Sequence, residues 1–173
     1  MHTDITPVLY ANAHSVRHHR KALKLDEVHF QRVNDARDAV ARKFNVVNVW
    51  EEDVAIEFGK PSGQLASYAI KSLEAAAQDL SSAKIDVLVT APIDKHAMQQ
   101  AGFAYPGHTE YLQHLAGGDG EVLMLLVSDG LRVGTVTGHI PIKDVASAIT
   151  TDKIIAKARL LHQSLLRDFG IVS

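Results

Sequence analysis

A long amphipathic segment followed at once by a short apolar one constrains the fold more than any other feature of this sequence. Residues 59–82, GKPSGQLASYAIKSLEAAAQDLSS, carry apolar side chains at steps of three and four, which predicts an α-helix with Pro61 in its first turn. These apolar positions are Leu65, Ala69, Leu73, Ala76 and Leu80. The next segment, KIDVLVTAP at residues 84–92, has the short apolar character of a strand buried in a parallel sheet. A helix leading directly into such a strand predicts a βαβ crossover and an α/β fold.

The rest of the chain extends this pattern. A strand and an amphipathic helix are predicted within residues 4–25, and another strand at NVVNVW, residues 45–50. Short helices are expected near residues 94–101 and 108–116. Residues 121–139 contain two apolar runs joined at Asp-Gly, which predicts an antiparallel hairpin. The last predicted helix covers residues 152–169, with Thr151 as N-cap and Gly170 as the stop. The expected fold class is therefore α/β, with a mostly parallel sheet and one antiparallel hairpin.

Composition excludes several classes of function. Of the 173 residues 46% are hydrophobic and 22% charged, and the formal net charge of −2 with no long basic run speaks against nucleic acid or an anionic membrane as partner. The chain has no cysteine, which removes disulfides, thiolate metal sites and cysteine nucleophiles. Without a long apolar run or a leader sequence, a cytoplasmic location is expected. GxGxxG, GxxxxGK[ST] and GxSxG motifs are absent, which argues against a standard Rossmann nucleotide site, a P-loop NTPase and an α/β-hydrolase.

Two predicted strand ends and one helix start could form a site, because ligands in open α/β sheets gather beyond the carboxyl ends of strands. Thr90 to Pro92 precede Lys95, and Thr137 and Gly138 precede His139. In FAYPGHTEYLQHLAGG, residues 103–118, His108 and Thr109 stand at a helix start, where free N–H groups and the helix dipole favour an anion such as a phosphate. The same residues also suit a simple helix start, with Thr109 as a cap and Glu110 complementing the dipole.

His139 and Lys95 each allow more than one interpretation. The backbone of His139, between an apolar strand and Ile-Pro, is expected to be buried and extended, and its imidazole could be a metal ligand, a general base or a hydrogen-bonded core group. Lys95 is either an electrostatic or proton-relay group in a cleft or a solvated lysine on a short helix. His14 and His18 have the i, i+4 spacing of a metal pair, but no HExxH glutamate accompanies them.

The ordered motifs resemble one family closely. VTAPIDKHAMQQAGFAYPGHTEYL (residues 89–112), LMLLVSDGLRVGTVTGHIPIKDVASAIT (123–150) and LRDFGI (166–171) are similar to segments of the 4-hydroxythreonine-4-phosphate dehydrogenase family of vitamin B6 biosynthesis. DITPVLYANA and NVVNVWEEDVAIEFGKPS also resemble an earlier region of that family, so the resemblance covers nearly the whole chain.

The resemblance implies a fold similar to that of the isocitrate and isopropylmalate dehydrogenases, with two α/β domains around a cleft and a homodimeric assembly. On this basis residues 1–92 would belong to a partial first domain and residues 93–173 to a partial second domain. The implied reaction is oxidation of the secondary alcohol of 4-phosphohydroxythreonine with NAD and a divalent metal (zinc, magnesium or cobalt), followed by loss of carbon dioxide. His108 and Thr109 correspond to substrate-binding residues, His139 corresponds to a metal ligand, and Lys95 is a candidate catalytic residue.

The family pattern is incomplete here. Its two other metal-binding histidines, in an Asn-Pro-His-Ala-Gly and a Tyr-His-Asp segment, would follow FGIVS, and its glycine-rich opening strand is missing, so the chain looks like a central fragment. Two alternatives stay open. One is a paralogue that oxidises a phosphorylated sugar acid such as threonate 4-phosphate or erythronate 4-phosphate. The other is a non-catalytic domain that binds phosphate or dimerises.

Overall fold

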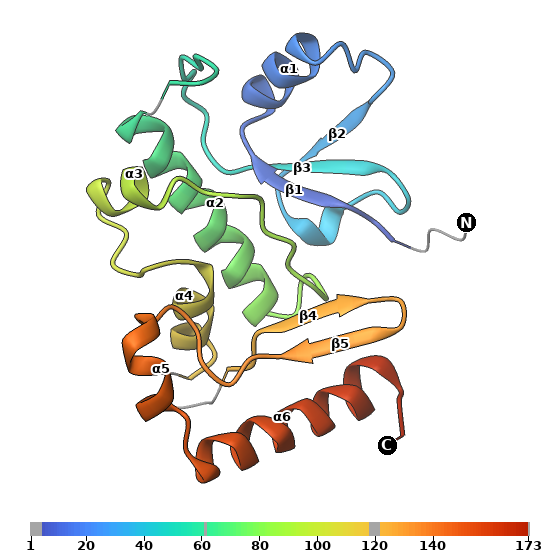
Figure 1. Ribbon diagram of the computed structural model, residues 1–173. Helices are drawn as coiled ribbons and strands as arrows, with labels where there is room; N and C mark the ends of the chain where they lie inside the picture. Colours follow the sequence, from blue (N-terminus) through green and yellow to red (C-terminus); the bar gives the residue numbers. More distant parts are fainter. Residues whose placement is uncertain (1–4, 61, 118–121, 173) are drawn as a thin grey trace. The chain divides into compact units, whose positions relative to one another are not determined.

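A computed structural model describes residues 5–60, 62–117 and 122–172 (Figure 1). The chain divides into two compact units, Met1–Leu112 and Gln113–Ser173, and each is described by itself. The sequence-based division of the domains after residue 92 stays a prediction. Pro61, predicted for the first turn of the long helix, lies outside the described residues.

The first unit contains a three-stranded parallel sheet in the order β1-β3-β2. β1 (Val8–Ala11) and β2 (Phe30–Val33) flank β3 (Phe44–Asn48), with Leu9 opposite Val46 and Val33 opposite Val47. Val46 is fully buried, as expected for the centre of a sheet covered on both faces. The adjacent Asn45 is also fully buried, and its side-chain amide donates hydrogen bonds to the carbonyl oxygens of Val40 and Lys43 at 3.1 and 2.8 Å.

The helices of this unit begin at polar caps. α1 (Ala13–Ala22) is capped by Asn12, and α2 (Gly63–Ser81) by Ser62. α2 contributes to two apolar clusters: Ala76 packs with Tyr10 and Val47 of the sheet, whereas Leu73 and Ala77 pack with Met98 of α3 (Lys95–Gln100). The apolar periodicity that predicted α2 therefore reflects burial of its side chains against both the sheet and α3. A short 3₁₀-helix, η1 (Ala36–Asp38), follows β2.

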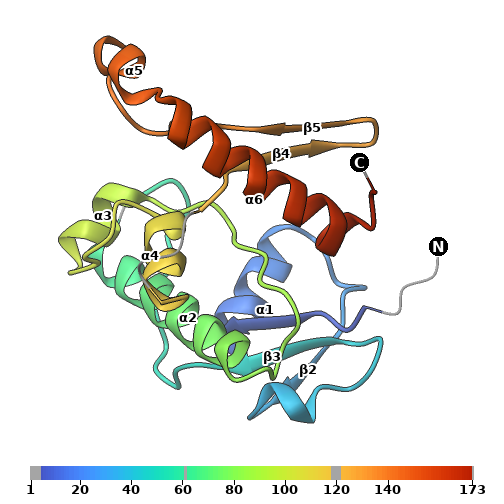
Figure 2. The same ribbon diagram turned by 90° about the horizontal axis from the view of Figure 1, so that it is seen from below.

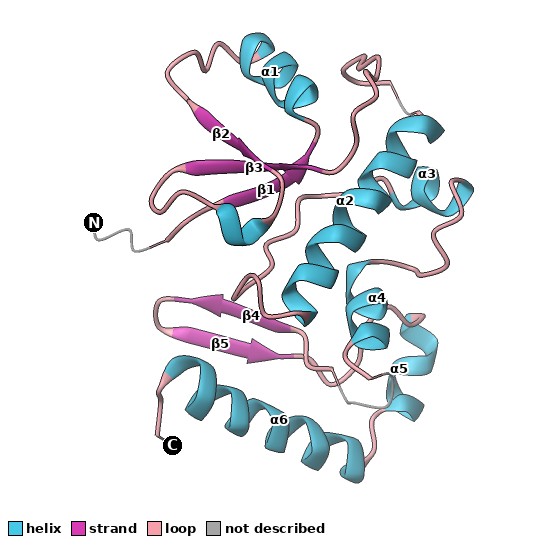
Figure 3. Cartoon of the chain, turned by 180° about the vertical axis from the view of Figure 1, so that it is seen from behind, coloured by secondary structure: helices cyan, strands magenta, loops and turns pink. Residues whose placement is uncertain are grey.

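The strand predicted at KIDVLVTAP is not formed. Residues 85–92, between α2 and α3, have no strand partner among the described residues and belong to the loop drawn in pink in Figure 3. Val87 and Val89 are 71% and 87% exposed, whereas Leu88 packs against both apolar clusters. The prediction of a buried strand is therefore wrong for the described chain: a parallel strand needs a hydrogen-bonded neighbour, and the described residues offer none at this position.

The second unit contains the predicted hairpin and the last helix. β4 (Leu125–Ser128) and β5 (Leu131–Gly134) are antiparallel and joined at Asp129-Gly130, as predicted. α6 (Thr151–Phe169) lies alongside this hairpin (Figures 1 and 2). Lys157 Nζ of α6 donates a 2.6 Å hydrogen bond to the carbonyl oxygen of Val122, and the Arg132 guanidinium stacks 4.9 Å from the ring centre of Phe169.

The ends of α6 refine the prediction. Its N-cap is Thr150 and not Thr151, because the Thr150 hydroxyl accepts the hydrogen bond of the Lys153 N–H at 3.2 Å. Gly170 ends the helix with a left-handed φ of 64°, as predicted. Three short elements with weak periodicity were not predicted: β2, η1 and α5 (Ile142–Ala148). None of the described helices is long and apolar enough to cross a membrane.

Candidate functional site

The first turn of α4 (His108–Leu115) is the best-supported candidate site of the described chain. An aromatic cluster holds this turn in place: the ring centre of Tyr111 lies 5.5 Å from that of Phe103 and 5.3 Å from that of Tyr105. Phe103 and Tyr111 are both buried, and burial raises the pKa of Tyr111. His108 and Thr109 are half-buried and follow the buried Gly107. Anchoring by the aromatic side chains keeps the first-turn N–H groups, which lack acceptors within a helix, at a fixed place.

Lys95, predicted as a candidate catalytic residue, lies against the same turn. A methyl group on Gly107 would lie 3.5 Å from Lys95 Cε and 3.4 Å from Glu110 Oε2, so both side chains pass beside this glycine. The structure therefore brings Lys95 next to the predicted substrate-binding residues, although it stands on a different helix. The positive end of the helix disfavours an ammonium group, and the Glu110 carboxylate beside the same glycine offsets this; an anion bound at this turn would interact favourably with both the ammonium group and the helix dipole.

His108 also lines a cavity of about 1010 Å³ in the first unit. Thr90, Ala91 and Pro92 of the predicted strand end also line this cavity, as does Ile93. In the sequence, this strand end and the helix start are separate candidates for a site. The structure places them on one cavity, as expected where a backbone segment of small residues approaches a ligand site.

His139, the predicted metal ligand, lies in the second unit and differs from expectation. Its backbone was expected to be buried and extended, but His139 is exposed and has a left-handed φ of 48°. β5 ends at Gly134, so the residue does not continue the strand, and the turn between Thr137 and Ile140 leaves the imidazole on the surface. This geometry argues against a hydrogen-bonded core histidine and leaves the imidazole accessible as a ligand.

The described residues do not by themselves form a metal centre. No group of three or more histidine, aspartate or glutamate side chains in the described part of the chain could hold an ion. A catalytic zinc ion normally needs three protein ligands. His139 is therefore at most one member of a larger ligand set, and no catalytic step can be assigned to a metal held by these residues alone.

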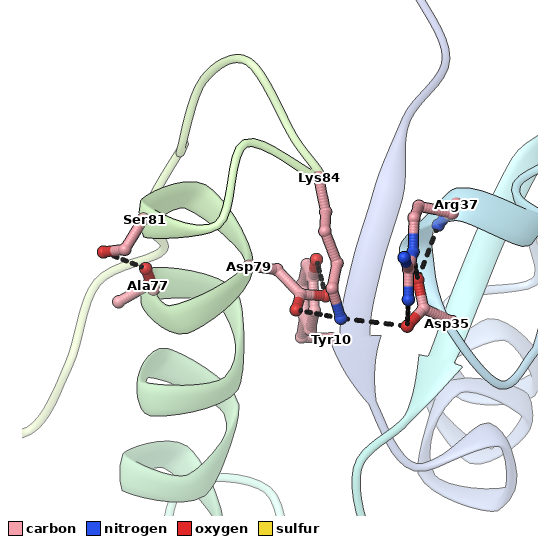
Figure 4. A network of polar contacts seen from close by, with 7 residues as sticks. All are labelled: Tyr10, Asp35, Arg37, Ala77, Asp79, Ser81 and Lys84. Atoms are coloured by element: carbon pink, nitrogen blue, oxygen red, sulfur yellow. Dashed lines mark hydrogen bonds and ion pairs between the residues drawn. The ribbon is translucent and has the colours of Figure 1, made fainter.

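A network of polar and charged groups, not predicted from the sequence, includes Tyr10, Arg37 and Lys84 from the lining of the same cavity (Figure 4). Lys84 Nζ is 2.9 Å from Asp79 Oδ1 of α2 and 2.9 Å from Asp35 Oδ2 beside η1. The Tyr10 hydroxyl of β1 donates a 2.8 Å hydrogen bond to Asp79 Oδ2, and Arg37 Nε donates to Asp35 Oδ1 at 3.0 Å. Because up to 69 positions separate the partners, no local motif could have indicated this network.

The network shifts the protonation equilibria of its members. Hydrogen bonds to its carboxylate hold the pKa of Asp35 well below its usual range, with the largest contribution from Arg37 and a smaller one from Lys84. Burial, followed by the hydrogen bond to Asp79, raises the pKa of Tyr10 far above its usual value. The carboxylate of Asp35 raises the pKa of Lys84. Since both cations that line the cavity here are paired with carboxylates, this network joins β1, η1 and α2 and does not present free positive charge.

Comparison with known proteins assigns the family. Residues 3–173 match the family described as "Pyridoxal phosphate biosynthetic protein PdxA". A 4-hydroxythreonine-4-phosphate dehydrogenase from Bacteroides thetaiotaomicron is 39% identical over 96% of this chain and 45% of its own length. The corresponding protein from Sulfurihydrogenibium is 34% identical over 97% of this chain and 51% of its own length.

Solved structures agree with this assignment. The crystal structure of a 4-hydroxythreonine-4-phosphate dehydrogenase from Burkholderia phymatum superposes with a TM-score of 0.80 at 29% identity, over 95% of this chain and 50% of that one. The chain thus spans about half the length of the relatives it matches. It belongs to the PdxA family, the dehydrogenases of pyridoxal phosphate biosynthesis.

Proposed function

We propose that this chain is the part of a 4-hydroxythreonine-4-phosphate dehydrogenase that binds the phosphate of the substrate. The observation that carries the proposal is that Lys95 lies beside the first turn of α4, whose His108 lines a cavity, in a chain that belongs to the PdxA family. The complete enzyme would oxidise the secondary alcohol of 4-phosphohydroxythreonine, and the β-keto acid formed would lose carbon dioxide.

The residues at this turn suit a phosphate group. His108 and Thr109 would donate hydrogen bonds from side chains and from first-turn N–H groups, and the ammonium of Lys95 would supply a compensating charge. Binding of the phosphate, remote from the reacting carbon, would fix the position of the alcohol and so contribute to the rate of the chemical step. Lys95 is also close enough to this turn to be a candidate proton-relay group.

The hydride acceptor of the proposed reaction is NAD, and a divalent metal such as zinc, magnesium or cobalt would stabilise the developing alkoxide. His139 is proposed as one ligand of that metal. Because the described residues do not supply a full ligand set, the remaining ligands and the NAD contacts are expected from polypeptide outside this chain. By the same family relationship we expect the complete enzyme to be a homodimer.

A phosphorylated sugar acid, such as threonate 4-phosphate, is the second candidate substrate. The helix start and Lys95 would bind the phosphate of either compound, so these residues do not distinguish the two. Kinetic measurements on a full-length enzyme that contains this chain, with both substrates, separate them: turnover of the sugar acid alone would overturn the first choice. Phosphate binding without turnover of either compound would favour a non-catalytic binding domain.

The role of His108 can be tested with His108→Ala in the same full-length enzyme. Loss of a charge-assisted hydrogen bond to phosphate, of roughly 1.5–3 kcal/mol, should raise KM about 10- to 100-fold and weaken inhibition by inorganic phosphate. His29→Ala, at an exposed position outside the cavity, is the matched control. Unchanged KM and phosphate inhibition in His108→Ala would reduce this histidine to a helix-start residue.

A further inference from the structure

The three histidines of α1 do not belong to the candidate site at α4. His14, His18 and His19 are exposed, and none of them lines the cavity of about 1010 Å³. His14 and His18 stand about one turn apart, a spacing that places two side chains next to each other on one face of a helix. Paired histidines of one helix bind a metal ion at this spacing. Whether this pair can do so depends on how its two rings are held.

One segment of the chain contacts both rings. Residues 51–60, between β3 and α2, contain no helix or strand. Asp53 of this segment lies beside His14, with 3.3 Å between Oδ1 and Nδ1. Phe58 of the same segment stacks on His18, with 5.6 Å between the ring centres and 18° between the ring planes. Because both contacts come from one short segment, the two imidazoles face the same side of α1.

The contact with Asp53 leaves the other ring nitrogen of His14 open to a ligand. A carboxylate accepts hydrogen bonds and does not donate them, so its oxygen beside Nδ1 favours the tautomer with the proton on Nδ1. The lone pair of the neutral ring is then on Nε2. Histidines that bind metals usually have such an oxygen at their second nitrogen, because it fixes the ring and raises its basicity. Asp53 also supplies negative charge near the start of α1, where the helix dipole alone disfavours a cation.

The neighbouring side chains of α1 are directed elsewhere. Arg17 extends toward β2, and its guanidinium carbon lies 5.6 Å from the ring centre of Phe30. The imidazole of His19 is turned back along the helix, with Nδ1 2.8 Å from the carbonyl oxygen of Ser15. Adjacent residues of a helix do not face each other, so His19 is not expected to bind the same ion as His18.

We propose that the Nε2 atoms of His14 and His18 bind one transition-metal ion, with Cu²⁺ preferred, and that Asp53 positions His14 for this role. Imidazole suits Cu²⁺, Ni²⁺ and Zn²⁺, and of these ions Cu²⁺ binds such nitrogen ligands most tightly. Two imidazoles are fewer than the three protein ligands of a catalytic zinc site, so water would complete the tetragonal coordination that Cu²⁺ and Ni²⁺ accept. Zn²⁺ and Co²⁺ should bind this pair only weakly.

A bound ion would connect two turns of α1 and, through Asp53, hold residues 51–60 against this helix. This segment begins directly after Trp50, whose carbonyl oxygen accepts a 2.7 Å hydrogen bond from Asn12, the N-cap of α1. The single tryptophan of the chain is therefore linked to the helix that carries the proposed site. Since Cu²⁺ quenches the fluorescence of a nearby indole, binding should lower the emission of Trp50.

The test is titration of the 173-residue chain with CuCl₂, NiCl₂ and ZnCl₂, followed by calorimetry and by Trp50 fluorescence. We expect one tightly bound Cu²⁺ ion per chain, held roughly tenfold or more tightly than Zn²⁺. His14→Ala and His18→Ala should each weaken Cu²⁺ binding roughly tenfold or more, since each removes one of two ligands. His19→Ala is the matched control, because this histidine stands on the same helix and also contacts Phe58. Circular dichroism of each variant should match that of the parent chain.

Two further variants test the positioning role and the place of the ion. Asp53→Asn should weaken Cu²⁺ binding about 10- to 100-fold, as expected for a group that orients a ligand, whereas Asp26→Asn, at an exposed position after α1, should not. His139→Ala should bind Cu²⁺ like the parent chain, which separates this site from the metal of the proposed dehydrogenase reaction.

Electron paramagnetic resonance of the bound Cu²⁺ should show two nitrogen ligands in the parent chain and one in His18→Ala. The absence of saturable Cu²⁺ binding, or binding that His14→Ala and His18→Ala leave unchanged, would overturn the proposal. An equal loss of binding in His19→Ala or in His139→Ala would place the ion at other histidines and overturn it as well.

Discussion

Lys84 is the residue that joins three separate elements of the first unit. Its ammonium group bridges Asp35, which follows β2, and Asp79, which belongs to α2. Asp79 also accepts a hydrogen bond from the Tyr10 hydroxyl of β1 (Figure 4). Lys84 and Asp79 are largely shielded from water, so their interaction is screened less than that of a surface pair. Removing one partner would leave another charge only partly compensated, and this makes the network sensitive to protonation.

We expect Asp35 to contribute to stability in a defined pH range. Its pKa in the folded chain lies well below the value of about 3.9 for an unfolded aspartate, so the unfolded state binds more protons as the pH falls. The contribution of Asp35 is thus present above about pH 5 and lost progressively as the pH falls toward 2. Asp35→Asn should therefore flatten the decline of the unfolding free energy between pH 5 and 3. The slope of this free energy against pH should decrease by the equivalent of less than one bound proton.

Urea unfolding followed by fluorescence of Trp50, the single tryptophan, measures this slope. Asp26→Asn, at an exposed position between α1 and β2, is the control and should keep the slope of the parent chain. A parent-like slope in Asp35→Asn would show that the ion pairs with Arg37 and Lys84 do not persist in solution.

Individual residues could be predicted where local chemistry was decisive. Asp129-Gly130 indicated the hairpin turn, and Gly170 indicated the helix stop, where its left-handed φ of 64° is a conformation that glycine adopts readily. The His108 motif placed a helix start correctly, but its proximity to Lys95 depends on tertiary packing. The exposed left-handed backbone of His139 was not predictable, because an imidazole between Gly and Ile-Pro is compatible with several conformations.

At the scale of elements, polar side chains cap the starts of α1, α2, α3 and α6. The Asn12 side chain accepts hydrogen bonds from the His14 and Ser15 N–H groups at 2.8 and 3.0 Å and donates one to the Trp50 carbonyl at 2.7 Å. Asn12 is 3% exposed, so water cannot replace these bonds. One buried side chain therefore joins the start of α1 to the segment that follows β3.

Asn12→Ala should lower the unfolding free energy by about 2 kcal/mol, because it removes the cap and leaves buried backbone groups without partners. Ser62→Ala, which removes a single 3.3 Å cap bond from α2, should cost about 1 kcal/mol or less. Trp50 fluorescence in urea gives both values. Equal losses in the two variants would mean that the bond from Asn12 to the Trp50 carbonyl contributes nothing.

Elements were predictable when their own sequence was sufficient to form them. α2 and α6 each run for 19 residues with a continuous apolar face, and both were identified. KIDVLVTAP failed because a parallel strand depends on neighbours that its own sequence cannot reveal. Four-residue β2 and seven-residue α5 are too short for a periodic pattern to stand out.

At the scale of the whole molecule, the two units differ in how much they bury. All buried hydrophobic side chains of the described chain belong to the first unit. In the second unit Leu126, Leu131 and Ile142 are 58%, 62% and 93% exposed. Exposed apolar side chains in such number favour self-association or coverage by further polypeptide. Together with the half-length match to relatives, this suggests that the second unit needs additional chain to complete its core.

The 173-residue chain by itself is expected to lack dehydrogenase activity and to bind divalent metal weakly. The described residues hold no group of three metal-binding side chains, and His139 alone would have to compete with water for the ion. Substrate, NAD and metal must be held together for hydride transfer. The chain spans only about half the length of its relatives, so it supplies only part of such a site. Isothermal titration with zinc or cobalt, alongside an NADH absorbance assay, measures both properties.

His162→Ala, on α6, is the control for His139→Ala in the titration. Tight metal binding that His139→Ala abolishes and His162→Ala preserves, or measurable turnover, would show that this chain completes its site in another way.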